Sequence, residues 1–537
     1  MPAIVHRFSL GIPEFDLFSS LSFACALVAT LILLYIFLAK FNSILRVSFF
    51  TAALSNIFFQ WPMFLISDVL QESLKNPYWH FFVVQISVFV LLSYGILTTS
   101  NFTRAFHPEK ISFRRGHLLF SIFLGALLVF LYLRKVPFDC TALYAVLFDP
   151  QVTLLAREVS IKFAGSFIAT SSFGAFTNTL APVVIALSVA MIWHALRTRN
   201  ILQLVLFPLV ILAAVFVCML SGAKGLLLPS IIVILVASIL WNRSLIRKGI
   251  AAVASMLLLF GSLVVFEVVR DRGWSEAGAY PFGQCTAQLG ACDQGRELIL
   301  SLYKRDASLG LYKDRIQALE KELKIACEKP KEGAPNQSPW SYEDLEIAPK
   351  TERAVDEAAR SYLEGVIYRA LVIPTQVAAW HFLYVEEMGS PGFAAMPFAR
   401  RLTGSSVNMP ELVYQKYGSV FAHGDKTSTS TSPTSFLLAY PAYLGVLGLV
   451  LSLLAVIITD IIVSVLLLRV PNALYPIGVG LAAVISFNFI LSDFVTVMLS
   501  HGGAMAIALM AFFAVTRDGH VLRNALDLLK ITRKAQD

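Results

Sequence analysis

The chain has 537 residues, of which 57% are hydrophobic and only 15% are charged, and its formal net charge is +8. This composition excludes most water-soluble domains, because apolar runs of about 20 residues, the length that crosses a membrane, recur along it. The basic residues are dispersed at the ends of these runs, which argues against a nucleic-acid partner.

Hydropathy predicts an all-α polytopic membrane protein with about eleven spans. The predicted spans are residues 18–39, 47–70, 79–98, 117–134, 174–194, 201–220, 225–241, 249–268, 436–459, 474–492 and 496–515. They divide the chain into an N-terminal bundle (1–268), a large polar block (269–435), C-terminal spans (436–516) and a basic tail (517–537).

Orientation follows from the short basic connections, which mark the cytoplasmic side. Basic residues gather between Arg104 and Arg115, between Arg243 and Lys248, and in the tail. With the spans as predicted, all of these lie on one side. We therefore expect the C-terminus in the cytoplasm and the polar block on the opposite, extracytoplasmic side.

The polar block changes character along its length. Glu297–Cys327 has helical periodicity, whereas Glu328–Pro349 contains four prolines and is expected to be a loop. Thr351–Glu387 is again helical, with Pro374 expected to kink or end the helix. Residues 297–350 are interpreted as an insert without a catalytic role.

Four of the six cysteines lie in polar stretches, namely Cys140, Cys285, Cys292 and Cys327. If the block is extracytoplasmic, a disulfide can form between Cys285 and Cys292 or between Cys292 and Cys327, and the sequence leaves the pairing open. No histidine lies near these thiols, so they do not indicate a metal site. Walker, GxGxxG, HExxH and GxSxG motifs are absent from the sequence, and we expect no cofactor and no catalytic metal.

Cations are predicted at membrane depth on the outer side: Arg157, Lys224, Arg270, Arg272 and Arg369. Each could reach headgroups or pair with an acid, or it could bind a phosphate. Lys224 is the most specific of them, because the SGAKG turn lies between two apolar runs and opens a helix.

His423, in AHGDK, lies two residues before Asp425 and is a candidate general base. It could equally belong to a solvated linker, since TSTSTS follows. Glu411 is a further candidate base. His381 lies in an amphipathic aromatic run and is interpreted as a packing residue.

Three stretches resemble Wzy-type O-antigen polymerases. They are SGAKG between two spans, VIYRALVIPTQVAAWHFLYVEEMG around Arg369, and GSVFAHGDKTSTSTSPTSFLLAYPAYLGVLGLVL. The resemblance implies a GT-C-like glycosyltransferase of the bacterial inner membrane that polymerises undecaprenyl-pyrophosphate-linked repeat units without a metal. Its active face would be periplasmic, and membrane lipids and a chain-length regulator would be partners.

In that family, cations would stabilise the pyrophosphate leaving group. The resemblance implies phosphate contacts for Arg369 and Lys224, with Arg157, Arg270 and Arg272 supporting them, and implies His423 as the base. Two alternatives stay open. An O-antigen ligase would move finished glycan to a lipid A core, and a transporter or flippase would use polar residues and broken helices in the spans.

Overall fold

The computed structural model describes residues 16–39, 45–102, 115–149, 152–162, 167–221, 227–241, 280–293, 295–296, 298–299, 313–327, 372–396, 408–417 and 434–516. Every regular element in these ranges is a helix, and none is a strand. Six helical segments of this part are long and apolar enough to cross a membrane, or seven if a bent pair counts as one span. The chain is therefore a polytopic helical membrane protein, as predicted.

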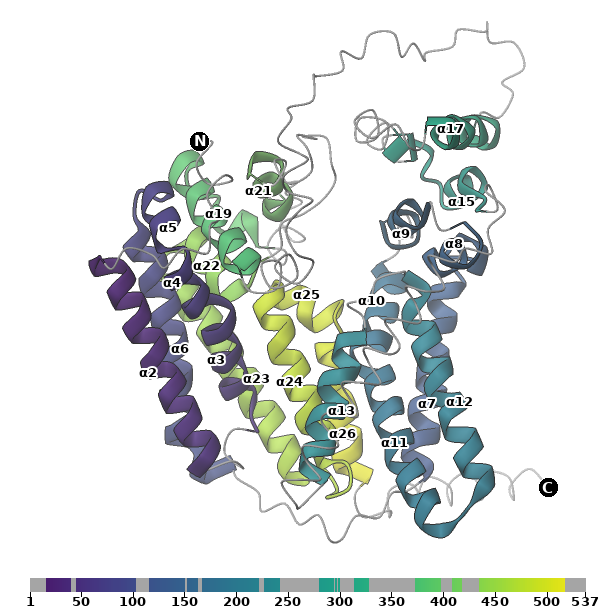
Figure 1. The fold of residues 1–537 in the computed structure, drawn as a ribbon, viewed down its shortest axis with the longest axis horizontal. Helices are drawn as coiled ribbons and strands as arrows, with labels where there is room; N and C mark the ends of the chain where they lie inside the picture. The colour runs from purple at the N-terminus through teal and green to yellow at the C-terminus, as the bar shows by residue number, and fades with distance from the viewer. Residues whose placement is uncertain are drawn as a thin grey trace, which may run out of the picture.

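The N-terminal bundle contains helices and short turns in the following order (Figure 1). They are α2 (Leu17–Ala39), α3 (Val47–Ser55), π-helical η2 (Asn56–Gln60), α4 (Trp61–Leu65), α5 (Ser67–Ser73), α6 (Pro77–Phe102), α7 (Arg115–Leu133), η4 (Phe138–Cys140), α8 (Ala142–Phe148), α9 (Thr153–Lys162), α10 (Phe167–Ala175), π-helical η6 (Phe176–Leu180), α11 (Ala181–Thr198), α12 (Ile201–Cys218), η7 (Met219–Ser221) and α13 (Leu228–Trp241).

The rest of the chain supplies the polar block and the C-terminal helices. They are α15 (Phe282–Gln288), α17 (Lys313–Cys327), α19 (Ile373–Met388), η12 (Gly392–Ala395), α21 (Met409–Tyr417), α22 (Phe436–Leu444), α23 (Val446–Arg469), α24 (Tyr475–Leu491), α25 (Phe494–Leu499) and α26 (Gly503–Val515). The predicted span 249–268 lies outside the described residues.

The short helices gather at one end of the bundle, which we call the outer end. Figure 1 shows α15, α17, α19 and α21 of the polar block at the same end as α5, α8 and α9, while the turn between α11 and α12 lies at the opposite end. That opposite turn contains Arg199, which is exposed. The polar block and this basic connection thus lie at opposite ends of the bundle, and the predicted orientation places them on opposite sides of the membrane.

The predicted span 47–70 is broken. α3 passes through η2 into α4, and the chain then bends by 75° at Ile66 before α5. Pro62 has no N–H to donate to the carbonyl four residues earlier. That carbonyl, of Phe58, instead accepts a hydrogen bond from Thr375 Oγ1 in α19 at 2.6 Å. A helix of the polar block thus contacts the π-helical turn that precedes Pro62.

A ladder of side-chain amides follows the η2 turn into the bundle. Asn56 Nδ2 donates to Gln60 Oε1 at 2.7 Å, and Gln60 Nε2 donates to Gln85 Oε1 in α6 at 2.5 Å. Thr30 Oγ1 in α2 donates to Asn56 Oδ1 at 3.0 Å. The ladder joins α2, η2 and α6 by polar contacts inside the apolar bundle.

The predicted span 436–459 is wrong in its boundaries. The helix stops at Gly445, whose φ of 60° suits glycine, and α23 then runs on to Arg469. α22 is a separate buried helix that crosses α23 closely, because a Cβ at Gly448 would lie 1.9 Å from the Tyr440 carbonyl oxygen. One apolar run of sequence therefore forms two packed helices.

The predicted span 496–515 is also divided, into α25 and α26. The break contains Gly502, with φ of 76°, whose carbonyl accepts from Thr179 Oγ1 at 2.9 Å. Gly174 in α10 lies against the same break, since a Cβ there would be 1.7 Å from the Ser500 carbonyl oxygen. Of these two contact residues, Thr179 lies in η6 and Gly174 lies near the end of α10, just before η6.

Within the polar block, one prediction is corrected and another falls partly outside the described residues. Pro374 stands in the first turn of α19, where a proline has no N–H bond to lose, and the helix predicted to precede it from Thr351 lies outside the described residues as far as position 371. Cys285 bonds to Cys140 rather than to Cys292, because α15 packs on η4. Of the two disulfides that the sequence left open for Cys292, the one to Cys327 is formed.

An ion pair in the interior joins three helices. Arg46, which precedes α3, and Asp460 of α23 are 3% and 0% exposed. Arg46 also donates to Thr98 Oγ1 at 2.8 Å and to the Tyr94 hydroxyl at 3.3 Å, both in α6. The other oxygen of Asp460 accepts the backbone N–H of Ser48 at 3.0 Å, so the acid also caps α3.

Replacing Asp460 with alanine is expected to lower the free energy of unfolding by about 3–5 kcal/mol, because Arg46 would stay buried without its counter-charge. Ser464→Ala, one turn further along α23, is the matched control and is expected to change stability by about 1 kcal/mol or less. Thermal unfolding of the purified proteins in detergent measures the difference. Equal melting temperatures of the two variants would contradict the role given to the pair.

Candidate functional site

Five of the six predicted site residues lie outside the described residues, namely Lys224, Arg270, Arg272, Arg369 and His423. The sixth, Arg157, is exposed on α9 at the outer end. α9 packs against η7, whose last residue, Ser221, precedes Lys224 by three positions. The structure thus brings the elements that carry or flank Arg157 and Lys224 together.

α19 is the part of the polar block that is packed into the bundle. Its residues from Thr375 to Leu383 are buried. Near its end, the Glu386 carboxylate accepts the backbone N–H of Lys75 at 2.8 Å and of Asn76 at 3.0 Å, in the turn between α5 and α6. Together with the contact of Thr375 to Phe58, these bonds secure both ends of α19.

Beneath α19, four titratable side chains form what we call the outer polar cluster: His381, Tyr440, Tyr443 and Asp493. His381 Nδ1 is hydrogen-bonded to the hydroxyl of Tyr443. The hydroxyl of Tyr440, one turn earlier in α22, donates to Asp493 Oδ2 at 2.6 Å. Three elements, α19, α22 and the start of α25, contribute to this cluster.

Further hydrogen bonds position the residues of the cluster and the helix ends beside it. Asp493 Oδ1 accepts the backbone N–H groups of Val495 at 2.8 Å and Thr496 at 3.3 Å, so it caps α25. Ser435 Oγ donates to the Phe489 carbonyl oxygen at 2.7 Å and fixes the start of α22 against the end of α24. This arrangement restricts α22 and α24 to one relative position.

The chemistry open to the cluster is limited by burial. His381 is 1% exposed, so it cannot meet a substrate from the aqueous side. The packing role predicted for His381 agrees with this burial. Asp493 is only half-buried, but both of its carboxylate oxygens already accept hydrogen bonds. The cluster therefore suits the positioning of neighbouring groups better than proton transfer.

α21 is attached to α19 by charge and by aromatic contact. Lys416 forms an ion pair with Glu387, and Tyr417 donates to Glu387 Oε2 at 2.9 Å. The Trp380 and Tyr417 rings stack with centroids 6.4 Å apart. Burial raises the pKa of the Glu387 carboxyl, but the bonds from Lys416 and Tyr417 outweigh it, and its net pKa lies below the usual 4.5.

Of the other two candidate bases, the structure describes Glu411 but not Asp425. Glu411, in the first turn of α21, accepts from Asn408 Nδ2 at 3.0 Å and from Gln415 Nε2 at 3.5 Å. It is partly accessible, so Glu411 stays a candidate base. Asp425 lies outside the described residues. No group of three or more His, Cys, Asp or Glu within the described ranges is placed to hold a metal ion.

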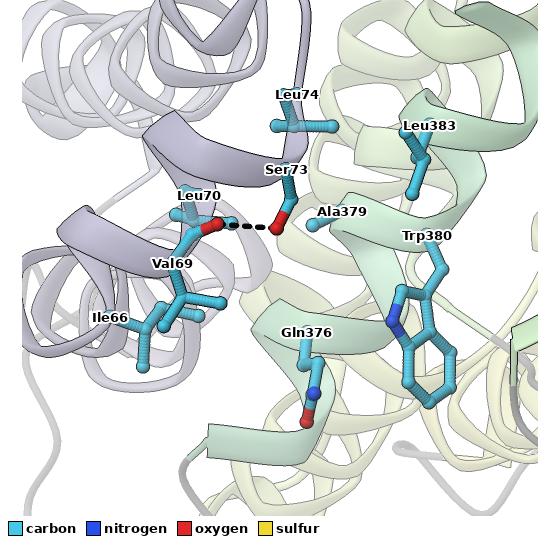
Figure 2. A pocket seen from close by; sticks show the side chains of 9 residues that line it. All are labelled: Ile66, Val69, Leu70, Ser73, Leu74, Gln376, Ala379, Trp380 and Leu383. Carbon is cyan, nitrogen blue, oxygen red and sulfur yellow. Dashed lines mark hydrogen bonds between the residues drawn. The ribbon is translucent and has the colours of Figure 1, made fainter. Parts of the chain in front are cut away.

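Figure 2 shows a pocket between α5 and α19 that is not a reaction site. Its lining is apolar apart from Ser73 and Gln376, and Ser73 Oγ is already bonded to the Val69 carbonyl oxygen at 2.5 Å. Its volume of about 10 Å³ is near the lower limit for one water molecule. The pocket is a packing gap beside the buried face of α19.

Sequence reasoning did not identify Arg46 and Asp460 as partners, and it weighed Asp493 only as a polar position in a span. The available signal was an acid inside a long apolar run, since Asp460 has no other charged residue near it in α23 before Arg469. No protein-family model, curated protein or solved structure matches the chain.

Acid is expected to weaken the attachment of α21 to α19. Because the folded pKa of Glu387 is lowered, its stabilisation is complete above pH 4.5 and is lost as the pH falls through the folded value. Glu387→Gln should remove this loss, which we expect to be on the order of 1 kcal/mol. Unfolding measured from pH 6 down to about pH 3 tests this, and superimposable pH profiles of variant and wild type would exclude it.

Tyr443→Phe is expected to lower the free energy of unfolding by about 1–3 kcal/mol, because the buried ring nitrogen of His381 would lose its partner. The double variant with His381→Phe removes both polar groups and should recover part of that loss. A double-mutant cycle on thermal unfolding measures the coupling. Additive effects of the two substitutions would show that the pair does not contribute.

Proposed function

We propose that this chain is a Wzy-type polymerase, a GT-C-like membrane glycosyltransferase of the bacterial inner membrane. It joins undecaprenyl-pyrophosphate-linked oligosaccharide repeat units into a surface polysaccharide such as O-antigen. The reaction takes place at the outer leaflet and uses no metal. The proposal keeps about eleven spans, a periplasmic loop domain and a cytoplasmic C-terminus.

One observation carries this proposal: α19, which belongs to the polar block, is buried in the outer end of the bundle. A polar block attached in this way forms one surface with the helix ends, where the headgroup of a lipid-linked substrate would lie. Arg369 precedes Ile373, the first residue of α19, by four positions. η7, which ends three positions before Lys224, packs against α9, which carries Arg157, and α9 lies at the same outer end as α19 (Figure 1).

The chemistry requires stabilisation of a leaving pyrophosphate more than it requires a strong acid. Arg369 and Lys224 would bind the phosphates, supported by Arg157, Arg270 and Arg272, and Arg can form two parallel hydrogen bonds to one phosphate. His423 or Glu411 would accept the proton of the acceptor hydroxyl. The rigid outer polar cluster would keep α19 and α22 in register beside these groups.

Both disulfides lie at the outer end of the bundle, which supports the proposed orientation. Disulfides form and persist in oxidising compartments such as the bacterial periplasm. The same orientation directs Arg134 and Lys135, both exposed at the end of α7, to the outer side with the other cations. Membrane lipids and a chain-length regulator are the partners we propose.

A transporter or flippase is the second candidate, and the broken helices favour it. Transport sites are often formed by discontinuous helices with polar groups near the membrane midplane. The turns η2 and η6 are both π-helical, and each is followed by a proline, Pro62 and Pro182. The amide ladder from Asn56 to Gln85 adds polar groups at the first of these breaks.

Deletion of the gene in its native host, followed by complementation, tests the polymerase. Wild type is expected to restore the ladder of glycan lengths, whereas Arg369→Ala and Lys224→Ala should leave a single capped repeat unit. Lys324→Ala is the matched control, because Lys324 is an exposed cation of α17 at the same end. It should restore the full ladder. Surface polysaccharide separated by gel electrophoresis is the readout.

The other outcomes identify the competing functions. Long glycan that accumulates on the undecaprenyl carrier would indicate a ligase. Repeat units that are retained on the cytoplasmic side would indicate a flippase. An unchanged ladder in the deletion strain would refute every function in glycan assembly proposed for this chain.

A further inference from the structure

The four outer cysteines pair in the order in which they occur in the chain. Cys140 bonds to Cys285 across 145 positions, and Cys292 bonds to Cys327 across 35. The helices α8 to α13 lie between the first two partners in the chain. Each cysteine pairs with its neighbour in the series, so no wrongly paired intermediate is needed to reach the final arrangement.

The first bond connects two separate parts of the protein. Cys140 ends η4, and Cys285 lies in α15, which packs on both η4 and α9. The sulfur-bearing residues are 1% and 0% exposed. Tyr280, which is fully buried, donates its hydroxyl to the Cys140 carbonyl oxygen at 3.1 Å and closes the contact from the other side.

The second bond stays within the polar block. Cys292 and Cys327 are both half-buried, and they join the turn after α15 to the end of α17. α15 and α17 already cross closely, since a Cβ at Gly283 would lie 2.4 Å from the Glu322 carbonyl oxygen. This bond therefore reinforces a local contact, whereas the bond of Cys140 to Cys285 attaches the α15–α17 unit to the bundle.

We propose that a protein disulfide carrier on the outer side of the membrane installs both bonds, and that Cys140–Cys285 is the covalent anchor of the α15–α17 unit. The Cys140 thiolate attacks the carrier disulfide and forms a mixed disulfide, releasing one carrier thiol. The Cys285 thiolate then attacks the Cys140 sulfur and releases the second carrier thiol. Two cysteine thiols are oxidised and one carrier disulfide is reduced to two thiols.

Burial sets the order of these events. Once α15 has packed on η4, a carrier protein cannot reach either sulfur, because both residues are almost fully covered. Oxidation of Cys140 must therefore start before α15 docks. Cys140 waits as the mixed disulfide until Cys285, which is synthesised after α13, reaches it. This pairing is independent of the proposed glycosyl transfer.

Trapping the mixed disulfide tests the carrier. Cys285→Ser leaves Cys140 without its resolving thiol, and membranes quenched with acid and N-ethylmaleimide should contain a reducible adduct of this variant and the carrier. Cys140→Ser plus Cys285→Ser is the matched control and should contain no such adduct at that pair. A host without its periplasmic disulfide carrier should yield wild-type protein with reduced thiols. Normal pairing in that host would overturn the proposal.

Thiol counting in native membranes tests the anchor. After free thiols are blocked in detergent, reduction and a mass-tag maleimide should add four tags to wild type and two to Cys140→Ser, because Cys25 and Cys218 are outside both pairs. A membrane-impermeant phosphine applied to folded protein should open the half-buried Cys292–Cys327 bond first. No tags on wild type would place these thiols in a reducing compartment, and earlier opening of Cys140–Cys285 would refute the buried anchor.

Discussion

The ion pair between Arg46 and Asp460 fixes the centre of the bundle. It is fully enclosed, and its two members hold the start of α3, the inner face of α6 and the middle of α23 in one arrangement. α3 packs in turn against α24, which is buried along almost its whole length. Two charges in an apolar interior are tolerated only when each meets the other and their remaining bonds are made. The relative positions of these helices follow from that requirement.

A second constraint acts where helices break. In an apolar medium, a carbonyl that loses its helical partner must find another one. The Phe58 carbonyl, to which Pro62 cannot donate, accepts from Thr375 of α19, and the Gly502 carbonyl accepts from Thr179 of η6 in addition to the Ala506 N–H. The polar block thus contributes a hydrogen bond to a backbone carbonyl of the membrane bundle.

This attachment bears directly on function. A block that only hung from the membrane could move freely against the helix ends, whereas α19 is secured at Thr375, at His381 and at Glu386. Sites for anionic headgroups need cations at fixed distances, because charge stabilisation depends on donors that are already in position. In the proposed function, the outer polar cluster would supply such a frame, and the stretches that contain the predicted cations would supply the charge. In many proteins, rigid elements position the loops that carry the functional residues.

The α15–α17 unit is attached by a different principle. Tyr280 and Phe282 of this unit are fully buried, and a disulfide between distant parts of the chain adds to this packing by restricting the unfolded ensemble. The anchor at Cys140 and the buried ring of Tyr280 lie side by side, so covalent and packing contacts reinforce each other. The two outer units thus differ in what attaches them. α19 is attached by packing and hydrogen bonds, whereas α15 is also attached by a disulfide, which persists in an oxidising compartment.

The amino-acid sequence by itself determined the class of protein and the polar block, because run length and hydropathy are local properties, whereas it left the pairing of Cys292 open between Cys285 and Cys327. Only the tertiary structure decided where apolar runs break, as at Gly445, and which distant groups meet, as Arg46 with Asp460 and Cys140 with Cys285. Hydropathy does not register a reversal between two equally apolar helices, and a buried charge does not specify its partner. The roles of Arg369, Lys224 and His423 stay predictions for the same reason: their residue types indicate phosphate and proton chemistry, but convergence on one substrate is a property of three-dimensional placement.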